Sequence, residues 1–519
     1  MQKTGMRVRR WLAAAAMVAL GAGLSASPAQ AEWREARARH FILYGNMSEA
    51  DIRAMATRLE QFDGVLRYMY QLPEVDGQES NPVTVYVVPN IAAIRRLYGK
   101  GGDEVAGFYQ PRVSGSVAFT PIRGEGEGLN ALQPQYVLFH EYAHHFLFGN
   151  SGAAYPAWFS EGFAEFASTA RFDRDGVMVG VAAQHRAYGL LGSSKLPIDT
   201  LFDSSRRKLD PQQLDQVYGR GWLLTHFTMF DKEQRAKFGR YMTLLNTGTP
   251  SIAAGNQAYG SLKQLDHDLD KYLGRSRIPG MLVPFDRLPK ADVKVRSLSA
   301  GEQALIGYRM QSDRGVDQKT GRDLYARVAP VAAAYPQDSV AQGWFAEMAY
   351  DAGEDAAAEA AADRALAGDA KSQQALLYKG LIHLRRAQAA HSHDPKVWAE
   401  ARDWIIKANR ADPNAAEPLA VFYRSFVMAG EKPRPSAVLG LERAFQLAPQ
   451  DKGLRFTLAG QQIAANNIDM AKALLRPLAF DPHMPPDNPA AQLLALLDKG
   501  DSEAVRKGLA AMSGPTVDE

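Results

Sequence analysis

The 519-residue sequence contains no cysteine. Disulfide bonds, thiolate metal sites, cysteine catalysis and a lipid-modified N-terminal cysteine are therefore excluded. The sequence also lacks an excess of charge, because its formal net charge is only +3 and the first 31 residues contribute four basic side chains and no acidic one. The rest of the chain holds 56 basic and 57 acidic residues. This balance gives no electrostatic reason to expect an anionic membrane surface as a partner, and we expect no nucleic acid.

Long apolar runs are also missing. The apolar stretch Trp11–Leu24 is shorter than the roughly 20 residues that span a bilayer. It follows the basic segment Met1–Arg10 and precedes Ala29-Gln30-Ala31, whose small residues are typical of a cleavage site. These features predict a signal peptide over residues 1–31, cleaved after Ala31, rather than an uncleaved anchor. We expect an exported protein, periplasmic or secreted, with no integral membrane segment after signal cleavage.

The composition is that of a globular protein, with 46% hydrophobic and 23% charged residues. We assign a first domain to residues 32–285, where helices and strands alternate. Ser48 is expected to begin an amphipathic helix, and Val83–Val88 is expected to be a buried strand. Gly107–Gln110 and Ser116–Thr120 are predicted to be the two arms of a hairpin.

A charged segment, residues 286–298, is the expected linker to a second, alanine-rich domain over residues 299–519. Ala401, Ala437 and Ala471 begin similar segments at spacings of 36 and 34 residues. A period of about 34 residues resembles the tetratricopeptide repeat, in which small side chains let two helices approach closely. A generic array of helical hairpins is the alternative. We expect this domain to bind a protein partner or the substrate, or to dock on the first domain.

Chemically reactive side chains gather in one segment of the first domain. His140-Glu141-Tyr142-Ala143-His144 fits the H-E-x-x-H motif. At 3.6 residues per turn, His140 and His144 lie on one helical face and can bind one Zn²⁺ ion. Zinc lowers the pKa of a water molecule that it binds to roughly 7, and Glu141 can then take the proton as general base. His145 points about 100° away from this face and is not an expected ligand.

A second helix, expected to begin at Pro156, supplies a third ligand. Glu161 and Glu165 share a face of this aromatic helix with Trp158. Burying an unpaired carboxylate is costly, and a cation removes that cost, so Glu161 is the expected ligand. Glu165 is expected to accept the free ring N–H of a zinc-bound histidine and to orient that ring. The alternative is that both carboxylates face water, which is the commoner fate of glutamate.

His140-Glu141-x-x-His144, followed by Trp158-Phe-Ser-Glu161-Gly-Phe-Ala, resembles the gluzincin metallopeptidases, the thermolysin- and aminopeptidase-like clan. The resemblance implies an α+β zincin-like peptidase domain, here followed by an all-α tetratricopeptide-like helical repeat domain. It also implies zinc-dependent hydrolysis of peptide or protein substrates. No Gly-x-Met-Glu-Asn-type motif for a substrate amino terminus is present, which favours an endopeptidase. In such folds the strand before the zinc helix usually forms the edge of the cleft; Ser116–Thr120 fits that place or is an interior strand.

Hydrolysis of a peptide bond also needs a hydrogen-bond donor to the developing oxyanion. Tyr218 and His226 are the candidates for this transition-state donor, with His185 third, although each is more often a structural residue. His391-Ser392-His393 is expected to be a polar loop in a repeat insertion rather than a metal site.

The leading hypothesis is an exported zinc endopeptidase whose repeats bind protein partners or substrate. The alternative is a non-catalytic cell-envelope scaffold or interaction protein with a vestigial or structural zinc site. The intact Glu141 favours the enzyme, because a purely structural site has no need of a base. A zinc hydrolase of non-peptide substrates is a third hypothesis.

Overall fold

The computed structural model describes residues 32–74, 81–102, 105–124, 133–186, 190–192, 195–481, 484–485 and 487–512. The predicted signal peptide, residues 1–31, lies outside the described residues. Within the described ranges, none of the helices is both long and apolar enough to cross a membrane.

A six-stranded mixed sheet forms the centre of the first domain, in the order β4-β5-β3-β2-β1-β9. Strands β2, β3 and β5 are parallel, whereas β1, β4 and β9 each pair antiparallel with their neighbours. The predicted buried strand and the predicted hairpin are confirmed as β3 and as β4 with β5. The bounds are Trp33–Arg37 for β1, Phe41–Asn46 for β2, Val83–Asn90 for β3, Phe108–Gln110 for β4, Val117–Arg123 for β5 and Lys294–Ser297 for β9.

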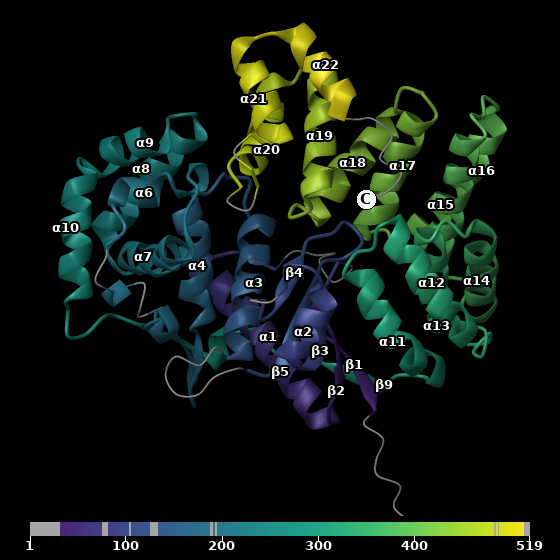
Figure 1. Ribbon diagram of the computed structural model, residues 1–519, viewed down its shortest axis with the longest axis horizontal. Helices are drawn as coiled ribbons and strands as arrows, with labels where there is room; N and C mark the ends of the chain where they lie inside the picture. Colours follow the sequence, from purple (N-terminus) through teal and green to yellow (C-terminus); the bar gives the residue numbers. More distant parts are fainter. Residues whose placement is uncertain are drawn as a thin grey trace, which may run out of the picture.

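The two faces of this sheet bury different side chains. Because side chains alternate along a strand, Phe41 and Leu43 of β2 point into a core that they share with α1, α3 and α4. Ile42 and Tyr44 point the other way, into a core that they share with the first helices of the repeat region. Trp344 of that region meets Tyr44 edge-on, with 6.1 Å between the ring centroids. The sheet is therefore a middle layer, with α3, α4 and α7 on one side and the repeats on the other (Figure 1).

Helices of the first domain surround the first of these cores, except α2, which packs against the second core on the other face of the sheet. Ser48 caps α1 by accepting a hydrogen bond from the Asp51 backbone N–H, as its sequence position predicted. A small second sheet, in the order β6-β7-β8, lies beside them. The helices are α1 (Glu49–Tyr70), α2 (Ile91–Tyr98), α3 (Pro134–Gly149), α4 (Ala157–Ser168), α6 (Ile198–Phe202), α7 (Pro211–Phe230), α8 (Lys232–Asn246), α9 (Ser251–Tyr259) and α10 (Leu262–Leu273), and the strands are β6 (Arg171–Phe172), β7 (Gly176–Val179) and β8 (Met281–Pro284).

The segment expected to be a linker, residues 286–298, is part of the fold. Its residues Lys294–Ser297 form β9, which pairs antiparallel with β1 at the edge of the sheet. Arg296 of β9 places Nη2 2.6 Å from Glu35 Oε2 and 2.6 Å from Glu302 Oε1, so one guanidinium joins the sheet to the first repeat helix. A polar edge strand carries little hydrophobic signal, which is why the sequence pattern looked like a linker. The expected boundary at residue 285 therefore does not separate two independent units.

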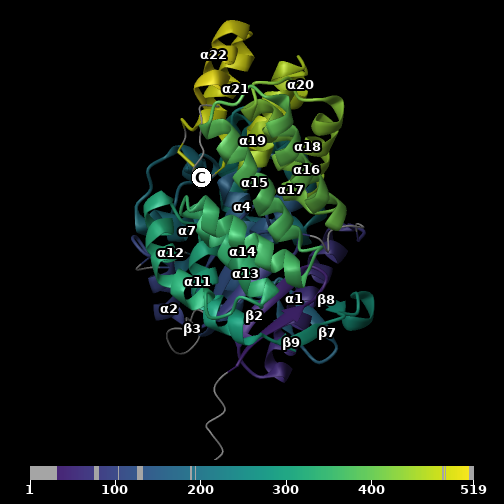
Figure 2. The same ribbon diagram turned by 90° about the vertical axis from the view of Figure 1, so that its right-hand side faces the viewer.

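The C-terminal region is an array of α-helical hairpins, as the repeat period predicted. Ala358, Ala401, Ala437 and Ala471 each lie in the second helix of a hairpin and have no exposed surface. Figure 2 shows the helices stacked from α11 to α22. They are α11 (Ala300–Asp313), α12 (Gln318–Ala332), α13 (Ser339–Asp351), α14 (Asp355–Gly368), α15 (Gln373–Ala389), α16 (Pro395–Ala411), α17 (Ala416–Met428), α18 (Pro435–Leu447), α19 (Lys452–Ala464), α20 (Ile468–Ala479), α21 (Pro489–Lys499) and α22 (Ser502–Met512).

Candidate metal centre

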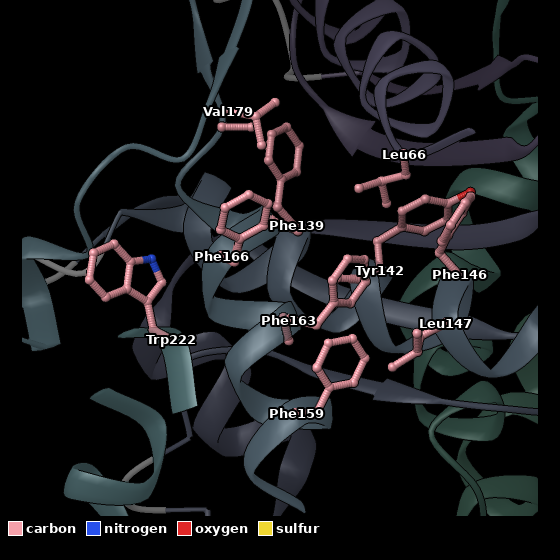
Figure 3. Close-up of a cluster of buried hydrophobic side chains, with 14 of the residues drawn as sticks. Leu66, Phe139, Tyr142, Phe146, Leu147, Phe159, Phe163, Phe166, Val179 and Trp222 are labelled. Carbon is pink, nitrogen blue, oxygen red and sulfur yellow. The ribbon is translucent and has the colours of Figure 1, made fainter. Parts of the chain in front are cut away.

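Helix α3, which carries the H-E-x-x-H motif, is held by aromatic packing on its inner face. Phe139 stacks on Phe62 of α1 with 3.9 Å between the ring centroids. The Tyr142 hydroxyl donates a hydrogen bond to Asp63 Oδ1 at 2.7 Å. Figure 3 shows Phe139, Tyr142, Phe146 and Leu147 gathered with the phenylalanines of α4 in this core. The motif therefore lies on a helix that packing holds rigid, as a metal or catalytic site requires.

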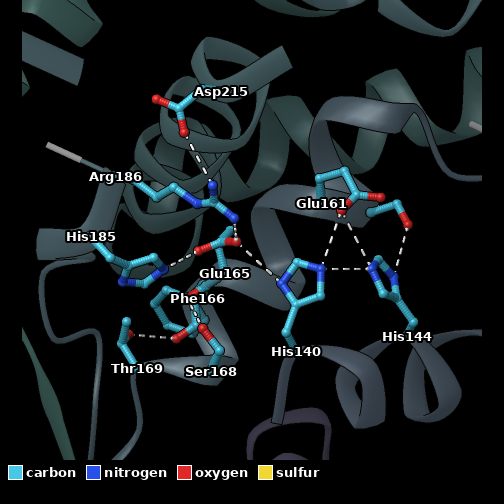
Figure 4. A network of polar contacts seen from close by, with 11 residues as sticks. His140, His144, Glu161, Glu165, Phe166, Ser168, Thr169, His185, Arg186 and Asp215 are labelled. Carbon is cyan, nitrogen blue, oxygen red and sulfur yellow. Dashed lines mark hydrogen bonds and ion pairs between the residues drawn. The ribbon is translucent and has the colours of Figure 1, made fainter. Parts of the chain in front are cut away.

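Helix α4 runs through the interior, and all twelve of its residues are buried. Its two carboxylates are no exception: Glu161 is 4% exposed and Glu165 is 1% exposed. The alternative in which both carboxylates face water therefore does not hold. Both carboxylates point toward α3, which packs beside α4 (Figure 4).

Three side-chain atoms converge between these helices. Nε2 of His140 and Nε2 of His144 lie 3.2 Å apart. Oε2 of Glu161 lies 3.4 Å from each of these two nitrogens. The three atoms form a nearly equilateral triangle, so the structure brings together the three residues that the sequence proposed as ligands.

The size of this triangle fits a tetrahedral zinc ion. Zinc binds histidine nitrogen and carboxylate oxygen at about 2.0 to 2.2 Å, which makes the distance between two ligand atoms about 3.4 Å in a regular tetrahedron. The observed distances of 3.2 to 3.4 Å match that value. Two imidazoles and one carboxylate are also the ligand set of a site that leaves its fourth position open for chemistry.

The other ring nitrogens of the two histidines are occupied by residues behind the triangle. Nδ1 of His140 lies 3.2 Å from Glu165 Oε1, the contact that the sequence analysis expected. Nδ1 of His144 lies 3.4 Å from the hydroxyl of Ser160, a fully buried residue that the sequence analysis did not single out. Such contacts fix the orientation of each ring and leave Nε2 to face the metal position.

Glu165 is itself held by two residues of a short 3-10 helix, Gln184–Arg186. His185 Nε2 lies 2.8 Å from Glu165 Oε2, and Arg186 Nη2 donates to Glu165 Oε1 at 2.6 Å. Arg186 also donates to Asp215 Oδ1 at 3.1 Å (Figure 4). Its guanidinium lies 4.6 Å from the ring centroid of Tyr218. Arg186 and Asp215 were missed from sequence, because an arginine on a short loop carries no periodic or motif signal.

The charges of this network shift the pKa values of its members. Burial disfavours the charged form of His140, but hydrogen bonds to Glu161 and Glu165 outweigh it and raise the pKa to about 10. Burial alone would raise the pKa of Glu165, yet His140, His185 and Arg186 hold it well below its usual range. The negative charge of Glu161, aided by burial, raises the pKa of Tyr218 above its usual range. The protein groups thus favour positive charge at the triangle and a protonated phenol beside it.

A pocket of about 200 Å³ opens onto this site. Its walls come from α3, α4, α7, the 3-10 helix and the residues that precede β4, and they include the expected base and two of the three candidate donors. The lining residues are Ala106, Gly107, Tyr136, Val137, His140, Glu141, Glu165, Ser168, His185, Arg186 and Tyr218. The structure therefore places Glu141, Tyr218 and His185 around one space next to His140.

His226 is not part of this pocket, in contrast to the expectation that it could donate to the oxyanion. It is fully buried on α7, where its ring nitrogens contact the Tyr272 hydroxyl at 2.9 Å and the Gly180 carbonyl oxygen at 3.1 Å. Burial lowers its pKa to about 4, so it is a neutral core residue. Eight residues along a helix separate it from Tyr218 by about 12 Å, so the two side chains are not equivalent candidates for donating to one oxyanion.

Two other histidine segments lie apart from the triangle. His145 Nδ1 lies 2.7 Å from the Tyr109 hydroxyl rather than at the metal position, and burial lowers its pKa to about 3. His391 and His393 lie in the exposed turn between α15 and α16, and His391 adopts a φ of 47°.

A second cluster of possible ligand atoms involves His40, Asp63 and Glu74. Here the protein supplies its own cation, because Arg67 Nε donates to Asp63 Oδ2 at 2.6 Å. His40 contacts Glu60 through Nδ1 at 2.8 Å and Glu74 through Nε2 at 3.2 Å. We interpret this cluster as an ion-pair network beneath α3 rather than as a metal site.

Two glycines allow α4 and α7 to cross closely enough to bring Tyr218 to the site. A Cβ on Gly162 would lie 2.2 Å from the Gly221 carbonyl oxygen, and a Cβ on Gly221 would lie 2.5 Å from the Trp158 carbonyl oxygen. These neighbours are backbone atoms, so they cannot rotate away. Gly162 of the Glu161-Gly162-Phe163 sequence is therefore needed for this helix contact.

We expect Gly162→Ala to lower the free energy of unfolding by roughly 1 to 3 kcal/mol, the usual cost of overpacking. Chemical denaturation measures this change. Gly239→Ala is the matched control, because Gly239 lies on α8, where no atom of the described residues would lie within 4 Å of an added Cβ; it should be neutral or stabilising by roughly 0.5 to 1 kcal/mol. Equal stability of both variants would contradict the close crossing.

No protein-family profile matches the chain, and no curated protein matches its sequence. Among solved structures, a thermophilic TPR protein of Thermus thermophilus matches with a TM-score of 0.31 and 18% sequence identity, over 38% of this chain and 100% of that chain. The stacked helix pairs themselves show that the C-terminal region is a helical repeat array.

Proposed function

We propose that this chain is an exported zinc-dependent peptidase of the gluzincin type, acting as an endopeptidase. The observation that carries the proposal is the triangle of His140 Nε2, His144 Nε2 and Glu161 Oε2, whose sides of 3.2 to 3.4 Å fit one tetrahedral zinc ion. The burial of the Glu161 carboxylate, and a pocket that His140 and Glu141 line together, support a catalytic rather than a structural site.

Zinc bound at this triangle would activate a water molecule and polarise the carbonyl group of the substrate. Glu141 lines the pocket next to His140, where it would accept the proton of the attacking water and pass it to the leaving amine. Tyr218 lines the same pocket, and a tyrosine hydroxyl, whose ordinary pKa is about 10, is protonated at neutral pH, so it would donate to the oxyanion. Glu165 and Ser160 would keep the two imidazoles oriented.

The position of β4 supports a peptide as substrate. β4 is the outermost strand at its end of the sheet, and Ala106 and Gly107, which precede it, line the pocket. An extended substrate could pair with this edge by adding a strand. From sequence, Ser116–Thr120 was expected to be either this edge or an interior strand. In the structure β5 lies between β4 and β3, so it is an interior strand and the edge is one strand further out.

Metal reconstitution tests the proposal. Metal-free protein should gain peptide-cleaving activity in proportion to added zinc, with a break at one equivalent per chain, and a chelator should remove it. Activity that is unchanged after complete removal of zinc would contradict the proposal.

We expect Tyr218→Phe to lower kcat by roughly 10²- to 10³-fold, the effect of losing one oxyanion donor. KM and zinc content should stay near the wild-type values, because the phenol is needed only in the transition state. Steady-state kinetics with one peptide measure this separation. Tyr155→Phe, outside the residues that line the pocket, is the control and should retain its kcat.

A further inference from the structure

The repeat array makes specific contacts with the β4–β5 end of the sheet. Figure 1 shows the array curving around this part of the first domain. Asn81, just before β3, donates through Nδ2 to the Asn414 carbonyl oxygen at 2.7 Å and accepts from the Ala416 backbone N–H at 3.2 Å. Val113, in the turn between β4 and β5, packs against the apolar core of the last repeats. The repeat array thus contacts segments of the first domain of the same chain.

A chain of side-chain hydrogen bonds continues from this interface to the metal helix. Gln450, before α19, donates through Nε2 to Ser116 Oγ at 3.3 Å. The Tyr109 hydroxyl of β4 donates to the same Ser116 Oγ at 2.9 Å and lies 2.7 Å from His145 Nδ1. His145 directly follows the ligand His144. Gln450 is 9% exposed and Ser116 is 1% exposed, so little water competes for these contacts.

Strand β4 needs such support because it is weakly held by the sheet alone. It has three residues, Phe108–Gln110, and among the described residues β5 is its one partner strand. Short edge strands are marginally stable by themselves. Its fit against α3 is nevertheless tight, since a Cβ on Gly107 would lie 2.5 Å from Val137 Cγ1.

We propose that the repeat array acts in cis as a brace that holds β4 against the metal helix, with Gln450 as the positioning residue that reaches the strand through Ser116 and Tyr109. This inference rests on the proposed function, in which the peptide substrate binds along β4. The brace itself is a property of the folded chain and can be measured without a substrate.

The test compares Gln450→Leu with Gln461→Leu in the full-length protein. Gln450→Leu keeps the side-chain volume and removes the bond to Ser116. Gln461→Leu removes a bond of similar kind inside the array, where Gln461 Oε1 accepts from the Tyr423 hydroxyl at 2.8 Å. Hydrogen exchange of the β4 backbone amides is read by mass spectrometry, and kcat and KM are measured with a peptide long enough to pair with β4.

We expect Gln450→Leu to speed exchange of the β4 amides about 3- to 10-fold, the effect of losing one hydrogen bond from a locally opening segment. KM should rise by a similar factor, whereas kcat at saturation and zinc content should not change. Gln461→Leu should leave both readouts at wild-type values. If Gln450→Leu does not fold, Ser116→Ala removes the same hydrogen bonds from the side of the sheet. It should give the same increase in exchange of the β4 amides.

Wild-type exchange of β4 in the Gln450→Leu protein, or the same increase in Gln461→Leu, would overturn the brace. Exchange that rises as expected in a protein that cleaves no peptide would uphold the brace and reject the peptidase. The two proposals therefore fail by different results.

Discussion

Glu141→Gln should lower the rate of peptide cleavage by about 10²- to 10⁴-fold while zinc content and thermal stability stay at wild-type values. The reason is that Glu141 lines the pocket beside His140 but contributes no atom to the ligand triangle. An amide matches the carboxylate in size, so packing does not change, but it cannot accept a proton. Cleavage of one fluorogenic peptide, measured at equal zinc loading, gives the ratio directly.

Glu165→Gln is the control that distinguishes the loss of the general base from the loss of any negative charge near the site. It removes one charge from the same pocket, but from the residue that orients His140. We expect it to weaken zinc binding by roughly 10- to 100-fold and to keep cleavage largely intact once zinc is in excess. Equal cleavage by the wild type and by Glu141→Gln would contradict the role of Glu141.

Glu161→Ala should produce the largest change in metal affinity. Loss of one of three protein ligands should exceed the roughly 10- to 100-fold loss that is typical of a residue behind the ligands. His140→Ala and His144→Ala should do the same. Competition with a chromophoric chelator measures each dissociation constant, and the metal content of the dialysed protein provides a second readout.

Glu74→Ala is the matched control for these variants. Glu74 belongs to the cluster with His40 and Asp63, whose atoms are also close enough together for a metal ion. In this cluster Arg67 already pairs with Asp63 and Glu74. This variant should retain one zinc ion per chain with unchanged affinity. Loss of zinc from Glu74→Ala, together with full zinc occupancy in Glu161→Ala, would show that the metal binds at that cluster instead.

The ligand triangle could be predicted from sequence because it depends on local geometry. The spacing of four residues places His140 and His144 on one face of any helix. Glu161 and Glu165 stood out because acidic side chains interrupt an otherwise aromatic helix, which is costly without a compensating charge. Pro156 marked the start of the second helix, and in the structure it is the N-cap residue of α4.

The remaining contacts of the site depend on packing between distant segments and left no local pattern. Arg186 meets Glu165 and Asp215 only after the chain has folded around α4. The polar strand β9 looked like a linker because an edge strand needs no buried face. His226 and Tyr218 lay in one short stretch of sequence, yet the geometry of a helix keeps them about 12 Å apart along its axis.

Hydrolysis of a peptide mixture by zinc-loaded wild-type protein in ¹⁸O-labelled water, read by mass spectrometry, tests the peptidase assignment most directly. A zinc endopeptidase should release fragments cut at internal bonds, with one ¹⁸O atom in each new C-terminal carboxylate, and Glu141→Gln should release almost none. Protein that holds one zinc ion per chain and yields no fragments would contradict the assignment and favour a scaffold with a structural zinc site.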